Sequence, residues 1–146
     1  MSKQILGFNK EYRFLSNFYP AEVEYDGLKY PSTEHAYQAA KTTDPAQRQR
    51  IRESQKAGDA KRFGKQVKMR SDWEQVKVDV MRDLVRQKFY KHGELKDKLL
   101  ATEDAYLEET NTWNDTFWGV CKNKGQNLLG KILMEVRAEL KIKIET

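Results

Sequence analysis

The chain has 146 residues, a formal net charge of +5, one cysteine and two histidines. A chain of this length can bury roughly 70% of the surface that it exposes when unfolded, so we expect a single domain over residues 1–146. One cysteine excludes an internal disulfide and every multi-cysteine zinc pattern. No stretch approaches the roughly 20 apolar residues of a membrane span, and the first residues lack the apolar run of a signal peptide. We therefore expect a cytoplasmic protein with no membrane partner.

The N-terminal third of the chain carries the signals of short strands. Residues 5–8 and 21–25 have the apolar and aromatic content of strands, and Asp26-Gly27 follows the second of them. Asp-Gly is a strong turn signal, which predicts a hairpin between residues 21–25 and 28–30. We expect these strands to form a small antiparallel sheet.

Helical patterns dominate from residue 32 onward. The predicted helices cover residues 32–42, 45–55, 57–64, 71–91, 94–101 and 126–142. The longest has a broad apolar stripe, which is typical of a helix at the centre of a core. In the last, Gly130 lies one turn from Leu133, and its missing side chain predicts the close approach of another segment. A small sheet beside a majority of helix makes an α+β domain, mostly helical, with a helical core.

The first predicted helix is unusual because it carries polar groups where a core helix would carry Leu and Ile. Ser32 or Thr33 can cap its N-terminus by accepting a hydrogen bond from a backbone N–H of the first turn. Glu34, Gln38 and Lys41 are separated by four and three residues, so a carboxylate, an amide and an amine share one helical face. This pattern indicates a site.

Positive charge is concentrated in the middle of the chain. Residues 41–100 hold 17 Lys and Arg against 9 Asp and Glu, and residues 61–70 hold five cations and no acid. Such a run suits a phosphate-bearing ligand or a nucleic-acid backbone. A solvated basic helix and loop would have the same composition, so both interpretations stay open.

Two further segments mix polar and aromatic residues. Residues 14–20 place Asn17 and Phe18 between aromatics, where an amide could bind a hydroxyl and a ring could stack on a base. Residues 109–119, followed by Asn127, combine turn formers with tryptophans and predict a ligand wall. The alternative is structural: the first segment is a loop with turn bonds, and in the second the tryptophans fill the core while an Asp caps a turn.

A metal site is not expected. The histidines, His35 and His92, have no cysteine cluster near them, and Cys121 stands alone. A zinc site would therefore need an unusual mixed ligand set. We expect no metal and no other cofactor.

Three ordered blocks in this chain resemble the NADAR family, whose YbiA-like members carry the same motifs. The blocks are Ser16-Asn17-Phe18, then Thr33-Glu34-His35 with Gln38-Ala39 and Lys41, then Asp115-Thr116-Phe117-Trp118-Gly119 with Gly125, Asn127, Leu129-Gly130, Leu133-Met134 and Arg137. The resemblance spans nearly the whole chain. It implies hydrolysis of an N-glycosidic bond at a ribose. Two kinds of substrate follow from it: ADP-ribose attached to guanine in nucleic acid, and phosphorylated ribosylamino-pyrimidine intermediates of riboflavin biosynthesis.

The residues fit this chemistry. Breaking a C1–N bond develops positive charge at the anomeric carbon, which a carboxylate can stabilise while it moves a proton. Glu34 is the candidate acid/base. Lys41 is a candidate for a Schiff base with an opened ribose, with Lys88 as the rival lysine and an ion pair with Glu34 as the structural alternative. Asp115 could orient water or bind ribose hydroxyls.

The remaining candidates bind substrate. Stacking is assigned to Trp73, Trp118 and Phe18, polar contacts to Asn17, Gln38, Gly119 and Asn127, and phosphate contacts to Lys61 and Arg70. The basic middle and the lack of a fused biosynthetic domain favour ADP-ribosylated nucleic acid over a phosphorylated ribosyl small molecule. A module that binds ADP-ribose or nucleic acid without cleaving it is the alternative of another class. No obligate protein partner is expected.

Overall fold

The computed structural model describes residues 3–145, and the chain divides into two compact units. One unit is Asn17–Lys88, called here the central unit; the other joins Met1–Ser16 to Phe89–Thr146 and is called the terminal unit. Among the described residues, no helix is both long enough and apolar enough to cross a membrane.

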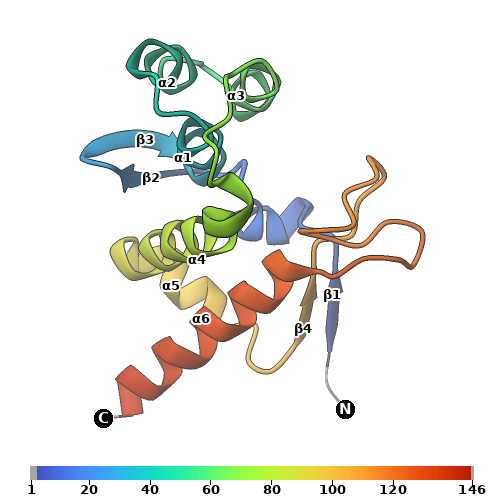
Figure 1. The fold of residues 1–146 in the computed structure, drawn as a ribbon. Coiled ribbons are helices and arrows are strands. Elements are labelled where there is room, and N and C mark those ends of the chain that lie inside the picture. Colours follow the sequence, from blue (N-terminus) through green and yellow to red (C-terminus); the bar gives the residue numbers. More distant parts are fainter. Residues whose placement is uncertain (1–2, 146) are drawn as a thin grey trace. The chain divides into compact units, whose positions relative to one another are not determined.

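The central unit is built from a hairpin and a set of helices (Figure 1). Its elements are β2 (Pro20–Tyr25), β3 (Leu28–Ser32), α1 (Thr33–Ala40), α2 (Pro45–Arg52), α3 (Ala57–Gly64) and most of α4 (Trp73–Lys91). Helix α1 contacts both strands of the hairpin as well as α2 and α3. All eight residues of α1 are buried, so this short helix is the centre of the unit.

Local signals explain how the central unit begins. Asp26 and Gly27 have φ angles of 52° and 82°, the left-handed conformation that a tight hairpin turn requires, and β2 pairs with β3 in antiparallel fashion. The predicted hairpin is confirmed. The Ser32 hydroxyl accepts a hydrogen bond from the His35 N–H at 3.1 Å. Ser32 therefore caps α1.

The terminal unit contains a second, parallel pair of strands. Its elements are β1 (Gln4–Leu6), the 3₁₀ helix η1 (Lys10–Leu15), α5 (Gly93–Leu100), β4 (Tyr106–Glu108) and α6 (Leu128–Glu145). Strand β1 pairs with β4 in the register Ile5 to Leu107. The prediction that the first strand joins an antiparallel N-terminal sheet was wrong, because its partner lies about a hundred residues away along the chain. The antiparallel sheet consists of β2 and β3 alone.

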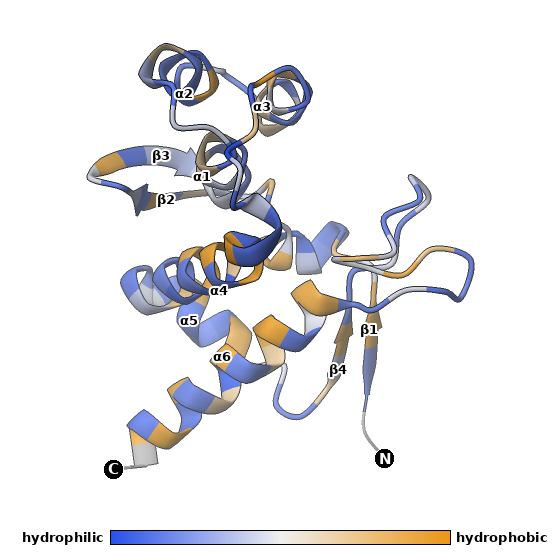
Figure 2. Cartoon of the chain, viewed as in Figure 1, coloured by the Kyte–Doolittle hydropathy of each residue, from blue (hydrophilic) through white to orange (hydrophobic). Residues whose placement is uncertain are grey.

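Gly130 gives the terminal unit its close packing. A Cβ at this position would overlap the carbonyl oxygen of Leu107, so α6 lies directly against β4. The expectation of a close approach at Gly130 is confirmed. Apolar side chains recur along α6 between hydrophilic ones, as Figure 2 shows, and Leu129, Leu133 and Val136 are at most 2% exposed.

Candidate active site

Glu34 lies in the first turn of α1 and is held by two contacts. Its side chain is buried, and Gln38 Nε2 donates a hydrogen bond to Glu34 Oε2 at 2.9 Å. Its backbone N–H donates to the carbonyl oxygen of Asn17 at 3.0 Å. The structure thus brings together two sequence blocks that are separated in the chain. A carboxylate in the first turn is also stabilised by the helix dipole.

Gln38 fills a space that Gly64 leaves for it. A Cβ at position 64 would lie 2.7 Å from Gln38 Cδ and overlap Oε1, so a larger residue could not sit there unless Gln38 moved. Because a carboxylate only accepts hydrogen bonds, the contact with Glu34 fixes which end of the amide faces it. Gln38 Oε1 is buried and has no hydrogen-bond partner among the described residues. The amide is therefore held by packing against α3 and by its single bond to Glu34.

Lys41 follows α1 and carries a perturbed amine. Burial is the main cause that lowers the pKa of Lys41, the positive charges of Lys61 and Lys65 lower it further, and Glu34 opposes the shift. Its Nζ lies 5.6 Å from the centroid of the Tyr37 ring. A lowered pKa increases the fraction of neutral amine near neutral pH, as a nucleophilic lysine requires. The environment therefore suits the predicted covalent role.

Lys88, the rival lysine, is more deeply buried than Lys41. It is 1% exposed, and burial lowers its pKa to about 7. Its Nζ lies 5.7 Å from the centroid of the Tyr19 ring. Both lysines of the central unit thus have depressed pKa values, and electrostatics alone do not choose between them.

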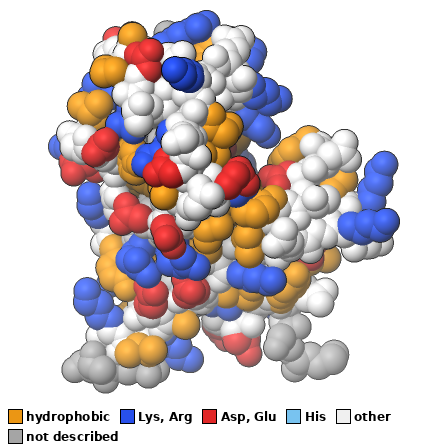
Figure 3. All heavy atoms as spheres, viewed as in Figure 1, with side chains coloured by type: hydrophobic (Ala, Val, Ile, Leu, Met, Phe, Trp, Pro, Cys, Tyr) orange, Lys and Arg blue, Asp and Glu red, His pale blue; other side chains and the backbone are white. Residues whose placement is uncertain are grey.

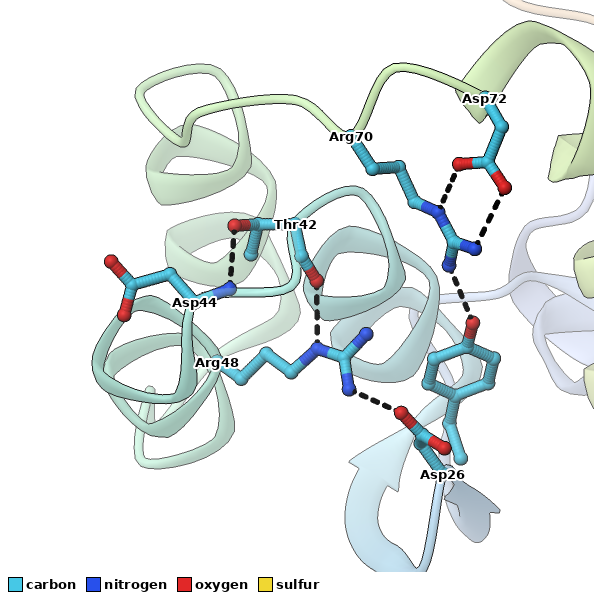
Figure 4. Close-up of polar contacts among 7 residues, drawn as sticks. Asp26, Thr42, Asp44, Arg48, Arg70 and Asp72 are labelled. Atoms are coloured by element: carbon cyan, nitrogen blue, oxygen red, sulfur yellow. Dashed lines mark hydrogen bonds and ion pairs between the residues drawn. The ribbon is translucent and has the colours of Figure 1, made fainter.

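Arg70 is engaged with protein groups at all three guanidinium nitrogens. It donates to Asp72 through Nε at 2.6 Å and Nη2 at 3.0 Å, and to the Tyr25 hydroxyl through Nη1 at 3.0 Å (Figure 4). The Asp72 carboxylate raises the pKa of Arg70 and keeps it cationic. Its backbone N–H donates to the carbonyl oxygen of Lys41 at 2.7 Å. The phosphate contact predicted for Arg70 stays a prediction, and it requires a phosphate to replace Asp72 or Tyr25.

A pocket of about 780 Å³ lies beside Arg70. It is lined by Thr42, Thr43, Asp44, Lys68, Met69, Arg70, Ser71 and Asp72. Asp44 belongs to this pocket and also caps α2 by accepting from the Ala46 N–H at 2.8 Å. The pocket therefore combines cations with a carboxylate that already has a structural role.

The remaining central candidates differ in exposure. Phe18 is 43% exposed, and Lys61 Nζ lies 5.9 Å from its ring centroid. Trp73 is 3% exposed, with its ring centroid 5.2 Å from that of Tyr37, so it packs in the core as placed. Asn17 Nδ2 lies 3.5 Å from the sulfur of Met81. The binding roles of all four stay predictions, and exposure favours the one assigned to Phe18.

In the terminal unit, Asp115 caps a turn. Its Oδ1 accepts hydrogen bonds from the backbone N–H groups of Phe117 at 3.1 Å and Trp118 at 2.9 Å. The half-buried Trp118 ring packs edge-on against Phe117 with centroids 4.8 Å apart. The structural role that the sequence left open for Asp115 is present. Its role with water or ribose stays a prediction.

Asn127 and Gly119 hold the loop to strand β4. Asn127 is 3% exposed; its Oδ1 accepts from the Glu109 N–H at 3.0 Å, and its Nδ2 donates to the Leu107 carbonyl at 2.9 Å. A Cβ on Gly119 would overlap the Glu109 carbonyl oxygen. Both ends of the Asn127 amide are thus engaged in structural bonds, and contact with a ligand stays a prediction.

His35 is placed for structure. Its Nδ1 lies 2.7 Å from the Ser32 hydroxyl, and its Nε2 lies 2.9 Å from the carbonyl oxygen of Ser54. The carbonyl only accepts, so Nε2 carries the proton and Nδ1 accepts from Ser32. Burial lowers the pKa of His35, which favours this neutral form. Within residues 3–145, no three His, Cys, Asp or Glu side chains are grouped as metal ligands would be.

Sequence reasoning missed two parts of the site. Gly64 appeared only as the end of a helix, and its contact with Gln38 has no local signal in the chain. Tyr37 was passed over although it lies between Lys41 and Trp73 in space. Its position four residues before Lys41, on the same helical face, was a usable signal.

Comparison with known proteins identifies the family. The NADAR domain matches residues 6–141. The N-glycosidase YbiA of Escherichia coli is 40% identical over 97% of this chain and 92% of its own length, and an N-glycosidase of Nostoc punctiforme is 37% identical over 89% and 86%. A riboflavin biosynthesis protein of Vibrio vulnificus is 39% identical over 90% of this chain, which spans only 36% of that protein.

The solved structure of YbiA has the same fold. The NMR structure of the E. coli protein matches 99% of this chain and 89% of its own with a TM-score of 0.85 and 39% identity. The α+β, mostly helical fold class is therefore confirmed. The chain belongs to the NADAR domain family.

Proposed function

We propose that this protein is an N-glycosidase that hydrolyses the C1–N bond of a phosphorylated ribose. The observation that carries this proposal is the buried Glu34 carboxylate, fixed by Gln38 and close enough to Lys41 to influence its pKa. The names of the YbiA and Nostoc relatives support the reaction class. Cytoplasmic location and the absence of a cofactor stay predictions.

Each group has a place in the reaction. Glu34 stabilises the positive charge that develops at C1 and delivers a proton to the leaving nitrogen. When the ribose ring opens, C1 becomes an iminium carbon bonded to that nitrogen. The neutral Lys41 amine adds to C1, the protonated nitrogen leaves, and water hydrolyses the new Schiff base to release the sugar aldehyde and regenerate the amine. Gln38 holds the carboxylate in place through these steps.

The substrate that we favour is ADP-ribose attached to guanine in nucleic acid. Lys61 and Lys65 act on Lys41 electrostatically, so positive charge adjoins the reacting group and would attract a polyanionic substrate. The second candidate is a phosphorylated ribosylamino-pyrimidine. It is favoured by the similarity to the Vibrio riboflavin biosynthesis protein.

Product analysis tests the proposal. The purified protein is incubated separately with a single strand that carries ADP-ribosylated guanine and with the ribosylamino-pyrimidine phosphates. Mass spectrometry then measures free ADP-ribose or ribose 5-phosphate, with Glu34→Gln as the inactive control. Release of either product supports an N-glycosidase and identifies its substrate. Binding without release of either product would instead support a non-catalytic module.

A further inference from the structure

Helix α3 has two faces of different character. Ala57, Ala60 and Gly64 are buried, and Gly64 packs on Gln38. The other face is formed by positions i, i+3, i+4 and i+7 of the helix and its C-cap, which share one side by helical geometry. They are Gly58, Lys61, Arg62 and Lys65. We call this the basic face of α3. Figure 3 shows Lys and Arg side chains gathered along the edge that α3 occupies in Figure 1.

An exposed aromatic ring lies at the start of the basic face. Phe18 Cε2 is 4.0 Å from the position that a Cβ on Gly58 would take, so the ring rests over the first turn of α3. Lys61 Nζ lies 5.9 Å from the ring centroid, and 43% of Phe18 is exposed. An exposed ring beside a cation offers a stacking surface for a base and a charge for its phosphate.

Two arginines share one ring farther along the helix. The Cζ of Arg50, from α2, is 4.0 Å from the centroid of Phe63, and the Cζ of Arg62 is 5.1 Å from it. Arg62 also contacts Asp59 at 3.2 Å. Guanidinium groups held on a ring lose little further freedom when they bind, and their planar donors match phosphate oxygens. A phosphate between them would also relieve their mutual repulsion.

We propose that the basic face of α3, together with Phe18 and Arg50, binds a single nucleic-acid strand next to the nucleotide whose ribosyl bond is cleaved. Phe18 stacks on a neighbouring base, and Arg50 and Arg62 contact the backbone phosphates. The proposal rests on the proposed function for the cleaved nucleotide, and it adds a surface for the nucleotides around it. The electrostatic effect of Lys61 and Lys65 on Lys41 supports this arrangement, because it places the basic face beside the reacting amine.

The test compares two substrates that differ only in flanking nucleotides. One is ADP-ribosylated guanosine; the other is a short single strand that contains it. The test variant is Arg50→Gln/Arg62→Gln. The matched control, Lys29→Gln/Arg82→Gln, removes the same charge from two other positions of the central unit, each of which pairs with an acid. We expect the test variant to lose about tenfold in kcat/KM on the strand and less than about twofold on the nucleoside, with both values unchanged in the control.

Two kinetic results would overturn the surface but not the reaction. One is an equal loss on both substrates, which would mean that the arginines support the fold or the site itself. The other is a wild-type protein that cleaves nucleoside and strand with equal efficiency. If neither substrate is cleaved, the proposed function fails, and the strand-binding surface is then judged by binding alone.

Binding is measured by fluorescence anisotropy with an unmodified single strand across a range of salt concentrations. We expect the wild-type protein to bind and the salt slope of the Arg50→Gln/Arg62→Gln variant to be shallower by about 1. Phe18→Leu should weaken binding to the single strand and leave any binding to a duplex unaffected, because only unpaired bases can stack on the ring. No binding by the wild-type protein, or equal preference for the duplex, would overturn the proposal.

Discussion

Gly64 and Gln38 form a matched pair in which one residue has no side chain so that the other can hold Glu34. A Cβ at position 64 would lie 2.7 Å from Gln38 Cδ, and the same amide donates to Glu34 Oε2 at 2.9 Å. The glycine therefore belongs to the candidate active site although it carries no functional group. Its contribution can be separated from that of Gln38 by a double-mutant cycle.

Gly64→Ala should displace the Gln38 amide from Glu34. We expect the free energy of unfolding to fall by about 1–3 kcal/mol, the usual cost of overpacking, and glycosidase turnover to fall with it. In a Gln38→Ala background the new methyl group has no amide to clash with, so the same glycine substitution should have much less effect. Urea unfolding and turnover are measured for both single variants and the double variant. Additive effects would show that Gly64 acts independently of Gln38.

Glu34→Gln should leave the protein folded and nearly inactive. The new amide oxygen can still accept from Gln38, so the contact within α1 is kept, but the group can no longer deliver a proton. We expect turnover to fall at least about 100-fold, as when a general acid/base is lost. Product release is measured by mass spectrometry, with circular dichroism to verify the fold. A near-native rate would remove Glu34 from the mechanism.

Borohydride should trap a sugar on Lys41 during turnover. The lowered pKa of Lys41 supplies neutral amine near neutral pH, and reduction of the Schiff base would make the adduct permanent. Lys41→Arg should abolish the adduct, which is located by peptide mass spectrometry. The control is Lys88→Arg. An adduct that persists in Lys41→Arg and disappears in Lys88→Arg would assign the covalent role to Lys88.

A second variant tests the cause of the lowered pKa. Lys65→Gln removes one of the positive charges that lower the pKa of Lys41. The pKa of Lys41 should rise, and the acidic limb of the trapping profile should move to higher pH. Lys29→Gln removes an exposed charge elsewhere in the central unit and is the comparison. An unchanged profile for Lys65→Gln would show that burial alone sets the pKa.

Local chemistry explains which elements could be predicted. The Asp26-Gly27 turn and the Ser32 cap depend on neighbouring residues, and both form as their sequences indicate. The 3₁₀ helix η1 and strand β4 were missed because each is short, and β4 pairs with a strand far away in the chain. The last helix begins at Leu128, two residues later than predicted, because Asn127 has a φ angle of 53° that no α-helix contains.

The candidate site follows the same division. The shared face of Glu34 and Gln38 follows from helical spacing and is present. The engagement of Arg70 with Asp72 and Tyr25, and that of Asn127 with β4, depends on tertiary contacts that residue type does not encode. Polar residues in an apparent ligand wall can bind the protein's own backbone instead of a ligand.

Asn127→Ala should mainly destabilise the fold. The substitution leaves the buried Glu109 N–H and Leu107 carbonyl without their side-chain partner, which costs about 1–3 kcal/mol for each group left unsatisfied. Urea unfolding measures the loss, with Gln126→Ala, at an exposed neighbouring position, as the control. Loss of substrate affinity at unchanged stability would instead support the predicted contact between Asn127 and a ligand.

Lys88 should make the stability of the protein depend on pH. Burial lowers its pKa to about 7 in the folded protein, whereas the unfolded chain has the ordinary lysine value of 10.5. Between these values the unfolded state binds the extra proton, so the free energy of unfolding should rise with pH, by up to about 1.4 kcal/mol per unit. Below the folded pKa both states are protonated, and the cost of burying the charge is fully present.

Lys88→Met keeps the length of the side chain and removes the charge. We expect this variant to be more stable than the wild type at pH 7 and to lack most of the rise in stability from about pH 7 to 10. The comparison is Lys29→Met, whose lysine side chain is 67% exposed and should contribute no such slope. Urea unfolding at a series of pH values measures both effects. A slope that survives in Lys88→Met would assign the titration to another group, and Lys41, whose pKa is also lowered by burial, would be substituted next.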